Sequence, residues 1–156
     1  MDSRISIGTD NPVAAKVIKH LVAAGGAVHG VLPATTQELI NVRASQINGC
    51  GFCLDMHTKE AVLAGESHQR LHLVATWRES TVFSEAERAA LEVTEQGTRI
   101  ADGGEVSEEA WENASRHFDE DQLTALVGQI ALINAFNTVN VITRQVGGDY
   151  QPGMFG

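Results

Sequence analysis

The distribution of proline is the feature of this sequence that most constrains its fold. Only three prolines occur, Pro12, Pro33 and Pro152, so no residue between positions 34 and 151 interrupts a helix by lacking a backbone donor. Apolar residues recur at helical spacing, and we find no convincing segment with the alternating pattern of a half-buried strand. The sequence therefore predicts an all-α fold of about six to seven helices.

Start and stop signals divide the chain into these helices. Asn11 and Pro12 are suited to begin the first helix, and Gly25-Gly26 to end it. Two pairs have the spacing of a capping box, which opens a helix: Thr35 with Glu38 and Ser84 with Glu87. Asp119 with Gln122 opens the longest helix. We expect helices at about 12–24, 35–47, 50–65, 67–78, 84–101 and 107–117, and the longest from 119.

The longest helix is expected to bury an apolar stripe. Its large apolar residues recur with a period near 3.6 and are Leu123, Leu126, Val127, Ile130, Ile133, Phe136 and Val141. Residues 1–10 and 148–156 lie outside the predicted helices, and we expect them to be loose or bound to a partner. Because 156 residues is the length of one domain, we expect a single domain over 1–156.

Composition argues against several classes of function. The net charge of −9 disfavours binding to nucleic acid or to anionic membranes, because both are negatively charged. Thirteen acidic residues and three arginines lie between Glu79 and Asp121, and we interpret this block as a solvated helical surface. No apolar run approaches the ~18 residues of a membrane span, and residues 1–10 lack the apolar stretch of a signal peptide. We therefore expect a cytoplasmic protein.

The two cysteines, Cys50 and Cys53, are the most informative residues. A close pair in a cytosolic protein is more often catalytic or metal-binding than structural. At positions i and i+3 of a helix their Cα atoms would be ~5 Å apart, within the range of a disulfide. The positive end of the helix dipole favours a thiolate there. The spacing does not decide which sulfur is activated, because Cys50 is nearer the helix end and Cys53 is nearer His57.

His57 and Glu38 are the candidates for acid–base chemistry beside the pair. His57 follows Cys53 by four residues on the same helical face, where it can accept the thiol proton or stabilise the thiolate. The break at Asn48-Gly49 can fold the preceding helix back and bring the carboxylate of Glu38 to His57, which would orient the ring. A capping role is the competing interpretation for Glu38.

Zinc binding is the main alternative for these residues. Cys50, Cys53 and His57 supply three ligands, but structural zinc usually takes four and no second Cys/His pair occurs. Only His68 or His72 could complete the set, and only by an accident of folding. A thioredoxin fold also uses CxxC, but the βαβ pattern that it requires is missing.

The spaced set Glu38, Cys50-x-x-Cys53 and His57, with Gln46-Ile-Asn-Gly directly before Cys50, resembles the signature of the alkylhydroperoxidase D-like proteins. These belong to the carboxymuconolactone decarboxylase superfamily. The likeness extends to residues 77–80 (WRES), 83–88 (FSEAER), Phe118 and 134–137 (NAFN), and so covers roughly 32–150. The four-residue set is a much more specific signal than CxxC alone.

The resemblance implies an all-helical peroxidase that uses no haem, flavin or metal. By position, Cys53 would be the peroxidatic cysteine, Cys50 the resolving one, and Glu38 and His57 the proton relay. Hydroperoxide would oxidise Cys53 to a sulfenic acid, which Cys50 would capture as a disulfide. An external dithiol, of the lipoyl type or in a small redox protein, would then reduce the disulfide. Short family members form homo-oligomers, often hexamers arranged as trimers of dimers, so we expect a hexamer, trimer or dimer.

Two departures from the family pattern bear on this interpretation. The best-known member has a histidine between its cysteines, whereas this chain has Phe52, so a relay role is lost there and the pocket is more apolar. The long two-repeat architecture is absent, which places the chain with single-unit members. The lactone decarboxylases lack the redox pair, which argues against their activity here. The open alternatives are a thiol–disulfide oxidoreductase or redox sensor that acts on protein partners, and a zinc-stabilised helical oligomer.

Overall fold

The part of the chain described by a computed structural model, residues 2–8 and 10–154, contains only helices and their connections. The prediction of an all-α fold is therefore confirmed. The elements follow in the order α1 (Pro12–Val28), α2 (Ala34–Asn48), α3 (Gly51–Leu63), α4 (His68–Leu73), η1 (Val74–Glu79), α5 (Glu85–Thr98), η2 (Arg99–Asp102), α6 (Glu108–Ser115) and α7 (Glu120–Thr143), where η marks a 3₁₀ helix.

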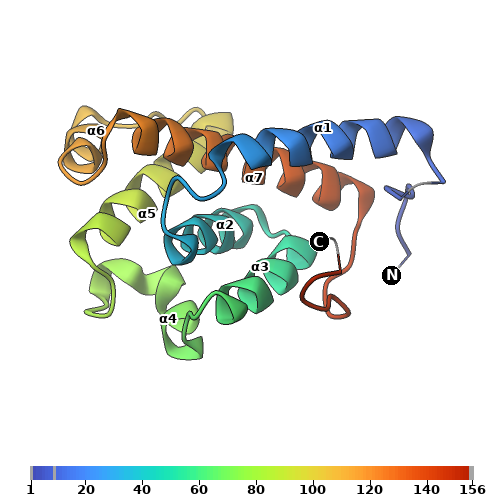
Figure 1. Ribbon diagram of the computed structural model, residues 1–156, viewed down its shortest axis with the longest axis horizontal. Coiled ribbons are helices and arrows are strands. Elements are labelled where there is room, and N and C mark those ends of the chain that lie inside the picture. Colours follow the sequence, from blue (N-terminus) through green and yellow to red (C-terminus); the bar gives the residue numbers. More distant parts are fainter. Residues whose placement is uncertain (1, 9, 155–156) are drawn as a thin grey trace.

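Helix α2 is the central element. It packs against α3, α5, α7 and η1, while α1 and α7 run beside one another along one side of the molecule (Figure 1). The neighbouring residues Leu39 and Ile40 of α2 belong to different apolar clusters. Leu39 packs with Leu91 and the residues of η1, and Ile40 packs with Leu126 and the residues of α6. Because α2 is buried on two sides, it fixes the helices that carry the functional residues.

Two of the expected helix ends are wrong. Helix α1 continues through Gly25-Gly26 to Val28, because Val28 packs over Gly128 of α7, where an added Cβ would lie 2.9 Å from its Cγ1. Helix α2 begins directly after Pro33 and has no side-chain cap, so Thr35 and Glu38 form no capping box. Glu38 is thereby available for a tertiary contact.

The other start signals are confirmed. Ser84 with Glu87 and Asp119 with Gln122 form capping boxes at the starts of α5 and α7. The helix expected at 67–78 is divided into α4 and η1. The chain passes from α4 to η1 at Val74, and inside η1 Thr76 leaves the helical backbone conformation while the buried Trp77 donates a hydrogen bond to Glu95 of α5.

The long helix α7 buries its predicted stripe only in part. Leu126, Ile130 and Ile133 are buried, whereas Val127 and Val141 are 48% and 45% exposed. By length and composition α7 could cross a membrane, contrary to the expectation from the sequence, and 33% of its most apolar window is buried in the chain. Helix α7 packs against α1, α2, α3, α5 and α6 in the folded chain.

The described parts of both termini are held by hydrogen bonds, so the expectation of loose ends is wrong for them. Arg4 donates to the carbonyls of the last turn of α7. At the other end, the carboxylate of Asp55 in α3 accepts from the backbone N–H groups of Gly148 and Tyr150. The C-terminal segment is therefore fixed to the helix that begins at the cysteine pair. Residues 1, 9 and 155–156 of the expected loose segments lie outside the described residues.

Glu95 of α5 is an exception to the expected solvated surface of the acidic block. It is 3% exposed and accepts hydrogen bonds from Arg43, Trp77 and Arg78. Burial by itself raises the pKa of Glu95, but the bonds from Arg78, Arg43 and Trp77 outweigh burial and hold the pKa below its usual value. This network ties α5 to α2 and η1.

Replacing Glu95 by glutamine should therefore lower the free energy of unfolding by about 3–5 kcal/mol, because the buried Arg43 loses its carboxylate partner. Since the folded-state pKa of Glu95 is depressed, its contribution is present above the unfolded-state pKa of ~4.3 and is lost as pH falls through the folded-state value. Urea denaturation at several pH values measures both effects. Glu92→Gln, which removes an exposed partner of Arg78, is the control and should cost at most about 1 kcal/mol. Equal stability of the two variants would contradict the prediction.

Candidate active site

A left-handed turn at Gly49 separates α2 from α3 and sets the position of the cysteine pair. Gly49 has a φ of 66°, which glycine adopts without the steric cost of a side chain. Helix α3 begins at Gly51, and Cys50 is its N-cap residue. The prediction that CxxC stands at the start of a helix is confirmed.

Each sulfur of the pair accepts a hydrogen bond. Sγ of Cys50 accepts from the backbone N–H of Cys53 at 3.3 Å, in the place that a capping oxygen usually takes. Sγ of Cys53 accepts from Nδ2 of Asn140, in α7, at 3.2 Å. Both cysteines are buried, at 2% and 0% exposure, in a small cluster with Ala44 and Ile133. The pair is thus shielded from solvent by the junction of α2, α3 and α7.

The surroundings of the pair place negative charge on Cys53. The hydrogen bond from the thiol of Cys50 has the largest effect and, with the amides of Asn140 and Asn137, lowers the pKa of Cys53 to about 6 against the opposing effect of burial. The charge of His57 acts in the same direction. The bond to Cys53, together with burial, raises the pKa of Cys50. These interactions favour the thiolate on Cys53 over the thiolate on Cys50, and the thiolate is the form of cysteine that acts as a nucleophile.

Glu38 and His57 meet as the sequence predicted. Oε2 of Glu38 lies 2.8 Å from Nδ1 of His57, and both side chains are less than one fifth exposed. Because an ionised carboxylate can only accept, it favours the proton on Nδ1 and leaves Nε2 to exchange a proton with a neighbour. Asn41 donates to the same carboxylate oxygen and accepts from Gln129 of α7. Helices α2, α3 and α7 together therefore fix the orientation of the imidazole.

Three asparagines of α7 form a polar row, and two of them, Asn137 and Asn140, are neighbours of Cys53 that our sequence analysis did not assign to the site. Asn134, Asn137 and Asn140 recur every three residues on the face of α7 that meets α2 and α3. Asn48 donates to Asn134 and Asn137, and the latter donates to Ser45. Buried amides at helical spacing in an otherwise apolar helix were the available signal, because such groups require partners.

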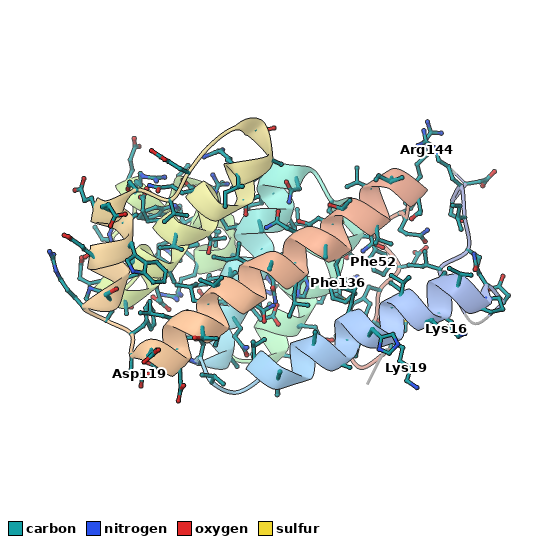
Figure 2. All side chains as sticks on the ribbon, turned by 90° about the horizontal axis from the view of Figure 1, so that it is seen from above. Lys16, Lys19, Phe52, Asp119, Phe136 and Arg144 are labelled. Carbon is teal, nitrogen blue, oxygen red and sulfur yellow. The ribbon has the colours of Figure 1, made fainter. Side chains whose placement is uncertain are left out.

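A cavity of about 170 Å³ opens beside the pair. Its walls are formed by Gly49, Cys50, Gly51, Asn140, Val141, Arg144, Gln145 and Val146. Figure 2 follows α7 from Asp119 at its start to Arg144 after its end, with Phe52 and Phe136 labelled between them. Phe52, which replaces the histidine of the best-known family member, packs against the cysteine cluster. Cys50 and Asn140 line the cavity, and Cys53 is not among its lining residues.

The zinc interpretation gains no ligand set from this arrangement. Within residues 2–8 and 10–154, no group of three or more His, Cys, Asp and Glu side chains comes together in a way that could hold a metal ion. His68 and His72 line a separate cavity, with Leu54, Thr58 and Lys59, rather than the cavity beside the cysteines.

Comparison with known proteins identifies the family. The sequence model of the carboxymuconolactone decarboxylase family matches residues 12–96, which is more than half of the chain. The chain belongs to this family. Among curated relatives of this decarboxylase-family chain, the uncharacterized protein YdfG of Bacillus subtilis is 42% identical over 107 residues, covering 69% of this chain and 72% of its own length. The uncharacterized protein YnjA of Escherichia coli is 32% identical, over 73% of this chain and 63% of its own length.

Solved structures of similar chains support the family's alkylhydroperoxidase D-like branch. A protein of unknown function from Agrobacterium tumefaciens, proposed to be the antioxidant defence protein AhpD, is 34% identical. It superposes with a TM-score of 0.85 over 96% of this chain and 100% of its own. The debrominase Bmp8, solved with 2,3,4-tribromopyrrole, has a TM-score of 0.75 at 18% identity over 90% of this chain and 73% of its own. At that identity the likeness shows a shared fold alone.

The hydrogen bond from Cys50 predicts how the acidity of Cys53 responds to substitution. Cys50→Ala removes the donor, so the pKa of Cys53 should rise from about 6 toward the ordinary ~8.5 of a cysteine. Cys50→Ser keeps a hydroxyl donor and should leave the pKa of Cys53 closer to 6 than in the alanine variant. Thiolate absorbance near 240 nm, titrated against pH in each single-cysteine protein, measures the pKa directly. Identical titrations of the two variants would show that Cys50 does not donate to Cys53.

Proposed function

We propose that this protein is a thiol-dependent hydroperoxide reductase in which Cys53 is the peroxidatic cysteine and Cys50 the resolving cysteine. The observation that carries the proposal is the buried Cys50–Cys53 pair, whose hydrogen bonds lower the pKa of Cys53, beside the Glu38–His57 contact. The AhpD description of the Agrobacterium relative supports the same class of activity. The cycle uses no haem, flavin or metal, and we propose that it operates in the cytoplasm.

Oxidation begins at Cys53. The thiolate attacks the terminal oxygen of the hydroperoxide, an S–O bond forms, the O–O bond breaks, and an alkoxide leaves. The imidazolium of His57, held by Glu38, gives the alkoxide its proton and later recovers a proton through the same relay. The products are an alcohol and a sulfenic acid on Cys53.

Resolution and reduction complete the cycle. The Cys50 thiol attacks the sulfenic sulfur, the disulfide forms, and water leaves. One sulfur of an external dithiol then attacks Cys50, which lines the cavity, and expels the thiolate of Cys53. Cys53 is the better leaving group because its pKa is the lower of the two. The second sulfur of the dithiol, of the lipoyl type or in a small redox protein, releases the reduced enzyme.

The position of Cys50 in the wall of the cavity also favours a second candidate, a thiol–disulfide oxidoreductase or redox sensor. In that function a protein partner's thiol would exchange with the Cys50–Cys53 disulfide, and peroxide would have no special role. The two candidates differ in one measurement. A peroxidase oxidises Cys53 with hydroperoxide much faster than a free thiol of equal pKa reacts, whereas an oxidoreductase does not.

Steady-state consumption of tert-butyl hydroperoxide with a dithiol donor tests the proposed peroxidase. Cys53→Ser should abolish turnover, and Cys50→Ser should allow a single oxidation of Cys53 but no cycling. His57→Ala and Glu38→Gln should each lower kcat by about 10²-fold, the ordinary contribution of a positioned acid–base group. Glu60→Gln, an acidic residue of α3 that bonds Tyr150 instead, is the control and should retain turnover. Wild-type rates in the His57 and Glu38 variants would remove the relay from the mechanism.

We propose further that the chain forms a homo-oligomer through α1 and the end of α7. No residue of α1 is buried, and Val13, Val17 and Val22 are 73%, 47% and 60% exposed. A groove of about 220 Å³ between these elements has almost wholly apolar walls. A second copy of this chain is a suitable cover, because it presents the same apolar face and an isologous contact buries both.

Light scattering after size exclusion tests the oligomer. The wild-type chain should elute at a multiple of its 16.7 kDa mass, such as a dimer, trimer or hexamer. Val17→Asp should shift the protein toward the monomer, because it puts a charge into the covered face. Ile100→Asp, at an exposed apolar residue of η2, is the matched control and should not change the mass. A monomeric wild-type protein would contradict the proposal.

A further inference from the structure

Asn140 has an unusual hydrogen-bonding state beside the reactive sulfur. Its side chain is 4% exposed, and its Nδ2 donates to Sγ of Cys53 at 3.2 Å. Its Oδ1 is buried and accepts no hydrogen bond from any residue that the structure describes. An unpaired buried carbonyl destabilises the fold, so such an atom in a native protein requires an explanation.

The neighbouring asparagine lacks this property. Asn137 donates through Nδ2 to the hydroxyl of Ser45, and its Oδ1 accepts from Asn48. Both ends of its amide are therefore used within the fold. Asn140 alone among the three asparagines of the row both lines the cavity and donates to the sulfur of Cys53.

From this geometry we propose that Asn140 binds the hydroperoxide and aligns its terminal oxygen with Sγ of Cys53. The inference rests on the proposed peroxidase and names a substrate-positioning residue for it. An amide presents its N–H and its carbonyl oxygen side by side in one plane. A single amide can therefore hold a thiolate through Nδ2 and an O–H donor through Oδ1 next to each other. Such a pair approaches the separation of about 3–3.5 Å that a displacement requires.

The chemistry of the ligand follows from the atoms that Asn140 offers. Only a molecule with an O–H group on the reacting oxygen can donate to Oδ1 and present that oxygen to the sulfur. In a hydroperoxide the terminal O–H makes this bond while the second oxygen and its substituent extend into the cavity, toward Val141 and Val146. The O–O bond then breaks, the sulfur keeps the O–H group, and the departing alkoxide takes its proton from His57. The volume of about 170 Å³ admits a small hydroperoxide or the head of a larger one.

The experiment compares two reagents that both require the thiolate but differ in the O–H group. In a Cys50→Ser background, where Cys53 is the only thiol, we compare the rate constants for hydrogen peroxide and for methyl methanethiosulfonate. The second reagent has no donor group, so its rate reports the ionisation and accessibility of Cys53 alone. The ratio of the two rates isolates the part of the peroxide reaction that depends on hydrogen bonding.

Asn140→Ala should lower this ratio at least tenfold. Loss of one positioned hydrogen-bond partner at a reacting atom typically lowers the rate by about 10²–10³-fold. Asn140→Leu is the second variant, because an apolar side chain of similar shape preserves the fold if alanine does not. Leucine also narrows the cavity, which would hinder the larger thiosulfonate more than peroxide and so raise the ratio. A fall in the ratio therefore cannot come from steric exclusion.

Asn134→Ala is the matched control on the same face of α7. Its amide bonds to Thr98, to the carbonyl of Ile130 and to Asn48, and none of its bonds is to a cysteine. Its ratio should equal that of the parent protein. An unchanged ratio in the Asn140 variants, or an equal fall in Asn134→Ala, would overturn the inference while the peroxidase stands. A parent protein that reacts with peroxide no faster than a free thiol would instead remove the proposed function.

Discussion

The turn between α2 and α3 is the constraint on which the site depends. Helix α2 is buried on two sides, so its end cannot move without disturbing both apolar clusters. The left-handed conformation of Gly49 then sends the chain back along α2, and α3 starts at once with Cys50 as its cap. This reversal brings His57 to Glu38 and places the cysteine pair against α7.

The low pKa of the Cys53 thiol is produced mainly by hydrogen bonds. No lysine or arginine bonds either sulfur in the described residues, and the acidic charge of the chain lies elsewhere, between Glu79 and Asp121. A thiol, two amides and a histidine charge offset the burial of Cys53 and lower its pKa. In a site of low polarity each such bond has a large effect, and it also fixes the position of the sulfur. The same groups can thus control both the ionisation and the geometry of a nucleophile.

Local signals predicted much of the fold because they act over a few residues. The capping boxes at Ser84 and Asp119 are satisfied within one helical turn, and both occur. The predictions failed where packing outweighed a local preference. Gly25-Gly26 does not end α1, because the contact of Val28 with Gly128 favours a longer helix. The Glu38 carboxylate, which fits a cap in sequence, bonds His57 instead, 19 residues away.

The sequence by itself determined the fold class and the dithiol at a helix start, and helical spacing placed His57 on the face of Cys53. Glu38 was predicted from the family resemblance and from the break at Asn48-Gly49. Only the tertiary structure decided which sulfur has the lowered pKa and that Asn140 donates to it. Those facts depend on the approach of α7, 87 residues away in the chain, to the start of α3. Hydrogen bonds of that range have no signature in local spacing, because they are set by how whole helices pack.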